Sequence, residues 1–299
     1  MLYEDIPDTL SQLIRTAFVP QNNHKFIVAD FSAIEARVIS WLANEKWRLD
    51  VFHGDGKIYE ATGEKMFGVP KSEIKKGSVL RDKSKISELA LGYEGGLGAL
   101  KRMGGDKMGL SNVEMIGLVR KWRIANPAIV DMWKEIDEAS KEAVRYHRAV
   151  KCTSKNVIFD CDGEFMTIEL PVGRKLFYYK PEFKDKKIGR SSMPIRSLCY
   201  RGIDQTTKQW ISIDTYGGKL TENIVQAVSR DLLADAMLRM EKAGYGIVGS
   251  IHDEVITEVP EINAQEWYDN LVKIMSTPPS WAYDLPLNAD GGVMDFYQK

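Results

Sequence analysis

The pattern of apolar and polar residues changes period several times along this chain. A run of four apolar residues, 26–29, has the length of a buried strand and ends at Asp30. Between residues 50 and 150, apolar positions instead recur every three or four residues, which is the period of an amphipathic helix. This pattern predicts helices over 58–67, 80–96, 113–122 and 128–147, with Trp122 and Trp133 in the core. Gly92 and the Gly95-Gly96 pair mark where the second of these helices loosens or ends.

Shorter signals mark the ends of other elements. Residues 1–20 carry apolar positions at helical spacing up to Pro20, which predicts a short lead-in helix. Ser32 and Glu35 stand three residues apart, as in a capping box that begins a helix. Asp30 is therefore expected at a corner between a strand and a helix, where a simple turn residue is the alternative.

Residues 150–215 change to short apolar segments that are typical of strands. The predicted strands cover 156–159, 165–170 and 175–179, with a turn at 171–173. Ten basic and three acidic residues lie between Arg174 and Lys208. We expect a β-rich insertion whose charge serves either as a solvated surface or as a contact for a phosphate backbone.

The last third of the chain predicts a long helix and a hairpin. Helical periodicity covers 221–240 and ends at Gly244. Two apolar segments within 245–260 then meet at His252-Asp253-Glu254, which predicts a tight hairpin with two carboxylates at its tip. Charged residues are common at hairpin tips, so this feature alone does not indicate a site.

Composition limits the class of protein only loosely. The 299 residues carry a net charge of −1, so the whole-chain charge does not indicate a nucleic-acid partner. The charge is nevertheless segregated, because 251–299 carries two basic and nine acidic residues. Three cysteines without Cys-x-x-Cys spacing favour a reducing compartment over a zinc site or a disulfide framework. No apolar run has membrane-spanning length, and no signal-peptide pattern is present.

The predicted helix over 80–96 suggests a chemistry for the carboxylates. Arg81, Lys85, Leu89 and Tyr93 follow one another at four-residue spacing and are expected on one side of it. Two cations can bind a triphosphate and the tyrosine can stack on a base, although a solvated basic helix end has the same pattern. Two aspartates from different strands, such as Asp30 and Asp253, can hold two Mg²⁺ ions about 3.5–4 Å apart. Together these features predict nucleotidyl transfer.

Three segments in this order resemble the motifs of family A DNA polymerases, the DNA polymerase I group, and most of all its bacteriophage or prophage branch. Residues 28–37 resemble motif A, residues 81–96 resemble motif B with its Arg-x3-Lys-x7-Tyr core, and residues 252–254 resemble motif C. Residues 216–226 have a phage-type pattern. The resemblance covers nearly the whole chain. It implies a DNA-templated DNA polymerase core that uses two Mg²⁺ ions to add dNMP to a primer 3′ end and release pyrophosphate.

The resemblance also implies an α+β fold, a right-hand palm with an antiparallel sheet plus a mostly helical fingers subdomain. The palm is expected at 1–50 and 214–299, and the fingers at 51–213, with the β-rich basic insertion at about 150–213. The thumb and the 3′–5′ exonuclease of the family are expected upstream and absent here, which predicts weak binding of duplex DNA. Primer-template DNA and dNTP are the implied partners, without a membrane, in the cytoplasm of a bacterial host.

Roles for individual residues follow from the resemblance. Asp30 and Asp253 would ligate both metal ions together with the Phe31 carbonyl, and Glu254 would lie nearby among the catalytic residues. Lys85 would protonate the leaving pyrophosphate. Arg81 and Lys85 would bind the triphosphate, and Glu35 would exclude a ribose 2′-hydroxyl. Tyr93 would occupy the position on which the template base stacks. Gln226 and His252 would lie along the minor groove of the primer-template.

The sequence departs from the family pattern at three further positions, and two of them, Leu89 and Tyr59, are expected to contact the nucleotide. Leu89 stands where the family has Phe or Tyr, so the family's rules for sugar discrimination do not transfer. Tyr59 replaces a histidine that contacts the triphosphate. Glu222 stands where an asparagine is common, with Asn223 beside it.

Two other functions stay open at this point. A palm-and-fingers module that binds nucleotide or primer-template, but is inactive without upstream domains, would carry the same carboxylates. A metal-dependent phosphodiesterase would also use them. The helix with Arg81, Lys85 and Tyr93 argues against the phosphodiesterase, because hydrolysis requires no triphosphate site.

Overall fold

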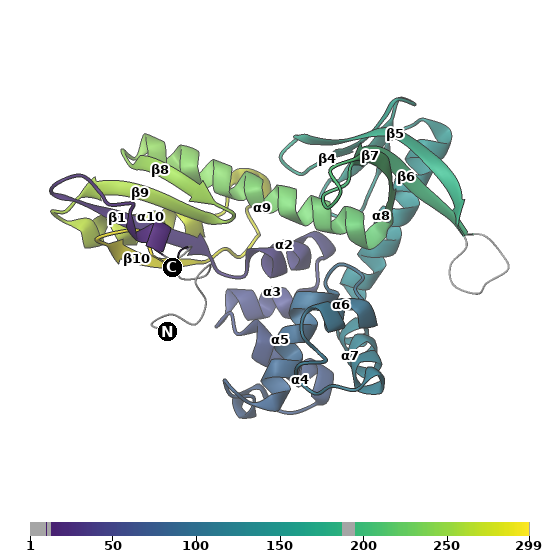
Figure 1. Ribbon diagram of the computed structural model, residues 1–299, viewed down its shortest axis with the longest axis horizontal. Helices are drawn as coiled ribbons and strands as arrows, with labels where there is room; N and C mark the ends of the chain where they lie inside the picture. The colour runs from purple at the N-terminus through teal and green to yellow at the C-terminus, as the bar shows by residue number, and fades with distance from the viewer. Residues whose placement is uncertain (1–9, 11–12, 187–194, 299) are drawn as a thin grey trace. The chain divides into compact units, whose positions relative to one another are not determined.

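Two compact units make up the structure, which is a computed structural model (Figure 1). The residues that it describes are 10, 13–186 and 195–298. Unit 1 comprises 1–34 and 229–299, and unit 2 comprises 35–228. The division falls inside the long helix α9 (Gly217–Lys242). The α+β class is confirmed, whereas the palm and fingers boundaries stay a prediction.

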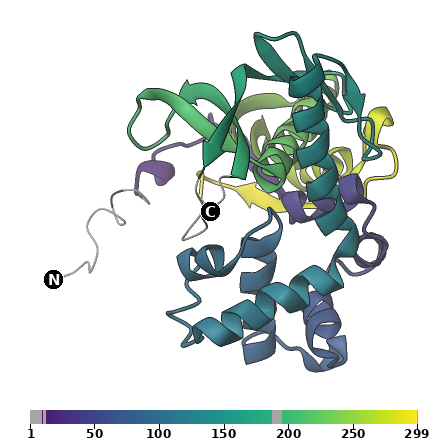
Figure 2. The same cartoon turned by 90° about the vertical axis from the view of Figure 1, so that its right-hand side faces the viewer.

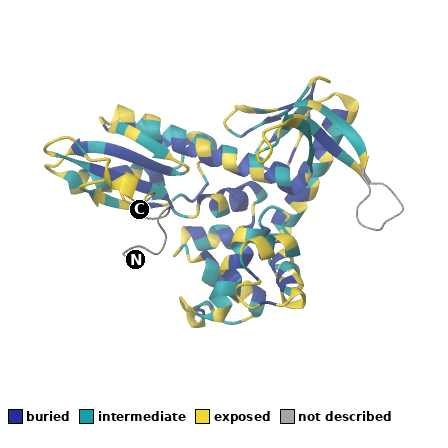
Figure 3. Cartoon of the chain, viewed as in Figure 1, coloured by how far each residue is buried: buried dark blue, intermediate teal, exposed yellow. Residues whose placement is uncertain are grey.

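Unit 1 is built on an antiparallel sheet. Its strands, in spatial order, are β10 (Ala289–Met294), β1 (His24–Phe31), β9 (Glu254–Pro260) and β8 (Gly246–Ile251). Because β1 is an inner strand that is buried on both faces, it reads as a continuous apolar run (Figure 3). Helix α10 (Ala264–Ser276) packs against β1, β9 and β10, and a 3₁₀ turn (Ser280–Ala282) follows it.

Most of the predicted elements of unit 1 are confirmed. The hairpin within 245–260 is formed by β8 and β9. The helix over 221–240 is part of α9, which begins four residues earlier. The lead-in helix is helical at 13–16, and its residues 1–9 and 11–12 lie outside the described residues. After it, the Tyr297 backbone N–H donates to the Phe18 carbonyl at 3.0 Å, which joins the two ends of unit 1.

Unit 2 contains a group of helices. They are α2 (Ile34–Ala43), α3 (Lys46–His53), α4 (Ile58–Phe67), α5 (Val79–Leu91), α6 (Leu97–Arg102), α7 (Asn112–Ala125) and α8 (Pro127–Tyr146), with a 3₁₀ turn at Lys71–Glu73. The helices predicted over 58–67, 113–122 and 128–147 are confirmed, the first with its predicted bounds. Trp122 and Trp133 lie in the core as predicted, with parallel rings whose centroids are 5.9 Å apart.

The helix predicted over 80–96 ends in the structure at the first of its two predicted stops, just before Gly92. Helix α5 ends at Leu91, and Tyr93 lies in the turn that follows. The Gly92 carbonyl accepts a hydrogen bond from Trp133 Nε1 at 3.0 Å, so a contact with α8 uses a group at the end of the helix. The prediction that Tyr93 continues the helical row of cations is therefore wrong, because its side chain leaves from a turn.

The β-rich insertion forms a six-stranded antiparallel meander in unit 2. Its strands pair in chain order: β2 (Val150–Lys151), β3 (Ile158–Cys161), β4 (Phe165–Glu169), β5 (Lys175–Lys186), β6 (Ile195–Ile203) and β7 (Trp210–Thr215). The three predicted strands correspond to β3, β4 and the start of β5. Helix α8 packs against β2, β3 and β4, and both views of the chain show this helix beside the sheet (Figures 1 and 2).

A buried ion pair joins the helices of unit 2. Arg48 of α3 donates to both carboxylate oxygens of Glu88 of α5, at 2.8 and 2.6 Å, and the two side chains are 1% and 4% exposed. Thr62 of α4 and Trp122 of α7 donate to the same carboxylate at 2.8 and 2.9 Å. Arg48 also donates to Asn126, directly before α8, at 3.1 Å. One carboxylate therefore fixes α5 against three other helices.

Removal of this carboxylate should strongly destabilise the protein. Glu88→Ala leaves the Arg48 guanidinium buried without its counter-charge, and we expect the free energy of unfolding to fall by about 3–5 kcal/mol. Chemical denaturation followed by circular dichroism measures this change. Asp131→Ala is the control, because it breaks an ion pair with Lys134 that is 74% exposed at the carboxylate. We expect it to cost less than about 1 kcal/mol, and equal losses in the two variants would contradict the assignment.

Candidate functional site

The register of the unit 1 sheet brings the predicted carboxylates together. Asp30, near the end of β1, lies directly opposite Glu254, the first residue of β9. Ile251 of β8 pairs with the same Glu254, so His252 and Asp253 form a two-residue hairpin turn. The first turn residue, His252, has the positive φ of +56° that such a turn requires. Asp30 and Asp253 are both partly exposed at this end of the sheet, whereas Glu254 is 2% exposed.

Glu254 has a buried partner that the sequence analysis did not identify. The Tyr297 hydroxyl donates to Glu254 Oε1 at 2.7 Å, and Tyr297 packs in a buried cluster with Phe26, Val28 and Ile256. Burial, followed by the nearby Glu254 carboxylate, raises the pKa of Tyr297 to about 12. Tyr297 stays protonated at neutral pH and holds the Glu254 carboxylate beside this buried cluster.

Arg81 of α5 is held by residues of α4. Arg81 Nε donates to Glu60 Oε1 at 2.5 Å, and both side chains are mostly buried. The Arg81 guanidinium also lies over the Tyr59 ring, 5.4 Å from its centroid. Burial is the main cause that raises the pKa of Tyr59, so this residue is a neutral surface for the cation. Lys85, one turn further along α5, is exposed.

Glu35 lies at the centre of a second hydrogen-bond group in unit 2. The Tyr93 hydroxyl donates to Glu35 Oε2 at 2.7 Å, and Gln226 Nε2 donates to Oε1 at 2.6 Å. Burial and the Glu35 carboxylate raise the pKa of Tyr93, which keeps the hydroxyl protonated as a donor. Both oxygens of Glu35 are thus engaged by side chains, and α2 begins at Ile34 after a left-handed Ala33. The Ser32 backbone N–H, which a capping box would give to Glu35, donates instead to the Asn288 carbonyl at 2.9 Å, so the predicted capping box is wrong.

The first residues of α9 pack directly against the turn that carries Tyr93. The Gly218 backbone N–H donates to Glu94 Oε2 at 3.0 Å, so this carboxylate caps the helix. A Cβ on Gly218 would lie 2.4 Å from Glu94 Cβ, and a Cβ on Gly217 would lie 2.0 Å from the Trp133 carbonyl oxygen. The glycine pair at the start of α9 is explained by this close approach.

The predicted site residues divide between the two units, and those of unit 2 include two separate contact groups, one around Arg81 and one around Glu35. Unit 1 contains the carboxylates with their flanking residues, namely Asp30, Phe31, His252, Asp253 and Glu254. Unit 2 contains Glu35, Tyr59, Arg81, Lys85, Leu89, Tyr93 and Gln226. Two further residues belong with them, Glu60 and Tyr297, which are the partners of Arg81 and Glu254. The adjacency of Glu60 to Tyr59 was the one available signal, and Tyr297 had none because its contact spans 43 residues.

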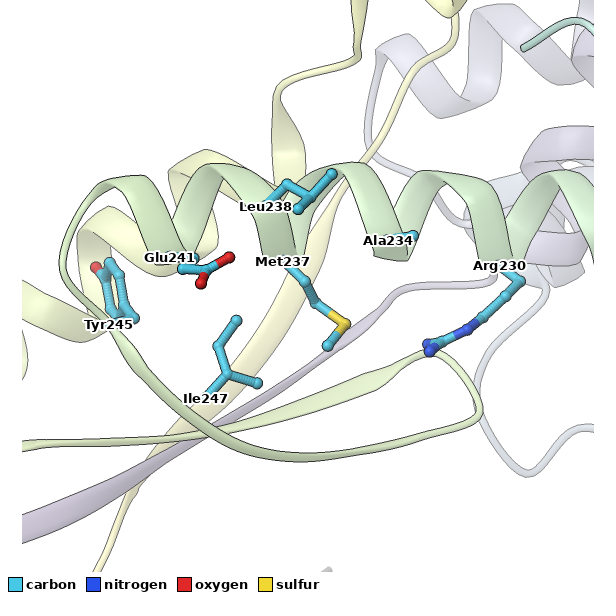
Figure 4. Close-up of a pocket in the computed structure, with 7 residues that line it drawn as sticks. All are labelled: Arg230, Ala234, Met237, Leu238, Glu241, Tyr245 and Ile247. Carbon is cyan, nitrogen blue, oxygen red and sulfur yellow. The ribbon is translucent and has the colours of Figure 1, made fainter. Parts of the chain in front are cut away.

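A separate pocket in unit 1 contains none of these residues. It has a volume of about 510 Å³ and lies between the second half of α9 and β8 (Figure 4). Apolar side chains such as Met237 and Ile247 line most of it, with Arg230 and Glu241 as its charged members. This composition offers no set of metal ligands.

The comparisons with known proteins agree on one family. A sequence model described as DNA polymerase family A matches residues 5–144. The chain is 47% identical to the DNA polymerase of Bacillus phage SP02 over its whole length, and it covers 45% of that protein. It is also 25% identical to the DNA polymerase I of Rhizobium leguminosarum, with 93% of this chain and 23% of the relative aligned. The chain thus spans less than half the length of these relatives.

A solved structure supports the fold. The POL domain of Pol1 from M. smegmatis, in complex with DNA primer-template and dNTP, matches 96% of this chain and 42% of its own at a TM-score of 0.64. The sequence identity is 18%, so this likeness concerns the fold alone. No helix among the described residues is long and apolar enough to cross a membrane.

The Tyr297 contact generates a prediction with a pH dependence. Tyr297→Phe removes a hydrogen bond to a buried carboxylate, and we expect the free energy of unfolding to fall by about 1.5–3 kcal/mol near neutral pH. The pKa is about 12 in the folded protein and 10 for an ordinary tyrosine, so this stabilisation is complete below pH 10 and is lost as the pH rises toward 12. Denaturation of both proteins at neutral and at strongly alkaline pH measures the effect. A difference between them that does not shrink at alkaline pH would contradict the assignment.

Proposed function

We propose, from the premise that this chain belongs to DNA polymerase family A, that it is the catalytic core of a DNA-templated DNA polymerase. Its reaction would join a dNMP to a primer 3′ end and release pyrophosphate, with primer-template DNA and dNTP as partners inside a bacterial host cell. One observation carries the proposal. The strand register sets Asp30 opposite Glu254 and places Asp253 in the adjoining turn.

The carboxylates of unit 1 fit the donor set that two magnesium ions require. Asp30 and Asp253 offer carboxylate oxygens at one end of the sheet, and Phe31, the last residue of β1, offers a backbone carbonyl. When bound, the metal ions would activate the primer hydroxyl and stabilise the leaving oxygen. Among the described residues, no group of three or more His, Cys, Asp or Glu side chains is placed to hold a metal. The proposed ligand set does not need one, because it takes two carboxylates and a carbonyl from the protein.

Glu254 has a supporting role in this proposal. Its carboxylate is buried and accepts from Tyr297, so it is held away from solvent while Asp30 and Asp253 are partly exposed. A buried negative charge beside two ligands adds to the field that favours cations at this end of the sheet. We therefore propose that Glu254 positions the hairpin and strengthens the field rather than transferring a proton.

The cations of α5 would bind the triphosphate. Lys85 is exposed and supplies three donors, and it can give a proton to the leaving pyrophosphate. Glu60 and Tyr59 orient Arg81, and the ion pair with Glu60 uses Nε rather than the two terminal nitrogens of the guanidinium. The planar guanidinium presents its N–H donors in a geometry that matches the oxygens of a phosphate group.

Glu35 would exclude a ribose 2′-hydroxyl. Its two oxygens are held by Tyr93 and Gln226, so the carboxylate has a fixed position on α2. A fixed side chain can reject an additional hydroxyl by steric contact, whereas a mobile one would move aside. Leu89 is 51% exposed on α5 and is proposed to contact the nucleotide through apolar surface only.

Substitution of the turn aspartate tests the metal assignment. Asp253→Asn keeps the size of the side chain but removes its charge, and we expect single-nucleotide incorporation to fall at least about a hundredfold. A labelled primer-template with Mg²⁺ at low salt measures incorporation, and circular dichroism checks the fold. Near-normal turnover would refute the assignment. If the unmodified protein binds dNTP but adds none, the chain is instead a binding module that needs further domains.

Substitution of the exposed lysine tests the triphosphate assignment. Lys85→Ala should lower incorporation by about a hundredfold or more, because a general acid and a phosphate contact are lost together. Lys83→Ala is the matched control on the same helix, since Lys83 pairs with Glu114 instead. We expect it to keep near-normal incorporation. A Lys85→Ala protein that loses only affinity for DNA would contradict the role given to Lys85.

A further inference from the structure

The six-stranded sheet of unit 2 carries aromatic residues on one face of β4, β5 and β7. Phe165 of β4 pairs with Tyr179 of β5, and Phe177 stands two residues before Tyr179 on the same face. In β6 and β7, Ile203 pairs with Trp210. Alternation along each strand places these residues on the same side of the sheet. We call this side the aromatic face; it consists of the four rings of Phe165, Phe177, Tyr179 and Trp210 together with Ile203.

The rings of the aromatic face form a continuous row. The Phe165 centroid is 6.1 Å from that of Phe177 and 5.2 Å from that of Tyr179. Tyr179 is in turn 6.2 Å from Trp210, across the intervening strand β6. A row of rings at this spacing can accept successive flat bases, each on its own aromatic surface.

The opposite side of the sheet is buried, which leaves the aromatic face open within unit 2. Met166, Ile168 and Tyr178 alternate with the aromatic face and are 0–5% exposed. Tyr178 accepts a hydrogen bond from Asn223 of α9. By contrast, Phe177 is 65% exposed and Trp210 is 58% exposed. Large apolar side chains gathered on a solvated sheet face indicate a binding surface more than they indicate a core.

Cations accompany the aromatic row. Lys180 Nζ lies 5.3 Å from the Tyr179 centroid, and Arg201 pairs with Tyr179 in the sheet register. Lys175 at the start of β5 and Lys208 in the turn before β7 are also exposed. Two of these cations have an acidic residue nearby. Lys175 Nζ lies 3.6 Å from Glu169 Oε2, and Arg201 Nε lies 3.9 Å from Glu182 Oε1. Exposed ion pairs at these distances are weak, so the cations can exchange them for phosphate oxygens.

We propose that the aromatic face binds single-stranded nucleic acid, with bases on the aromatic row and phosphates on Lys180, Arg201, Lys175 and Lys208. Base stacking with cation contacts is the chemistry of sequence-independent single-strand binding. A protein partner would favour an apolar surface with charge at its rim, whereas here the cations lie within and beside the row. If the proposed polymerase function holds, the bound strand is the unpaired template; the binding itself does not require that function.

The test measures binding of a fluorescein-labelled oligo(dT) of about 20 nucleotides by anisotropy at low salt. Replacement of two rings in the double variant Phe177→Ala/Trp210→Ala should weaken binding at least about tenfold, because two of the surfaces on which bases stack are lost. Tyr283→Ala is the matched control, since Tyr283 is an aromatic residue of unit 1 that is 79% exposed. We expect it to bind like the unmodified protein.

A second variant separates charge from stacking. Arg201→Gln should weaken binding and reduce its dependence on salt concentration, because one phosphate contact is lost. It also serves if the double variant fails to fold, which circular dichroism detects. Absence of oligo(dT) binding, or equal binding by the aromatic-face variants and Tyr283→Ala, would overturn the proposal. A double-stranded competitor that displaces oligo(dT) as well as a single-stranded one would also overturn it.

Failure of this proposal is distinguishable from failure of the polymerase proposal. Asp253→Asn should bind oligo(dT) normally while losing incorporation, because the hairpin carboxylate lies outside the aromatic face. In the opposite direction, the double variant should keep incorporation on a template with one unpaired nucleotide and lose it on a long unpaired template at limiting DNA. If the unmodified protein binds oligo(dT) but incorporates no nucleotide, the polymerase function is refuted and the proposal for the aromatic face is not.

Discussion

The buried ion pair between Arg48 and Glu88 is the contact on which unit 2 depends. Two charges with 1% and 4% exposure are tolerated because Glu88 also accepts from Thr62 and Trp122, and Arg48 also donates to Asn126. The pair lies on the side of α5 that faces the other helices. It therefore fixes the rotation of α5, and that rotation turns Lys85 and Leu89 toward solvent.

The Glu35 group depends on the same packing at the other end of α5. Trp122 contacts Glu88 and stacks on Trp133, whose indole holds the Gly92 carbonyl. The turn after Gly92 then presents Tyr93 to Glu35. The buried carboxylate of Glu88 is thus linked through Trp122 and Trp133 to the turn that positions Tyr93 against Glu35. A change in this part of the core should therefore also alter Glu35, the side chain proposed to select the sugar.

Unit 1 reaches its arrangement by register instead of by helix packing. The pairing of Asp30 with Glu254 follows from seven consecutive residue pairs between β1 and β9, and a slip by one residue would turn every side chain to the other face. Both strands are buried on both faces, and Asp30 stands near the end of the apolar run in β1, so a slip would move this charged residue toward a buried position. The same pattern that forms the core therefore also places the carboxylates.

The sequence alone determined the α+β class, most helix and strand positions, the hairpin and the identity of the proposed ligands, because these follow from local periodicity and from contiguous motifs. It did not determine which of the two predicted stops ends α5, the partner of Arg81, the partner of Glu254 or the role of Glu35 toward Tyr93 and Gln226. Each of these depends on groups that are distant in sequence, from 21 residues for Arg81 and Glu60 to 191 for Gln226 and Glu35. Local periodicity carries no information about such contacts, so only the packing of the folded chain selected them.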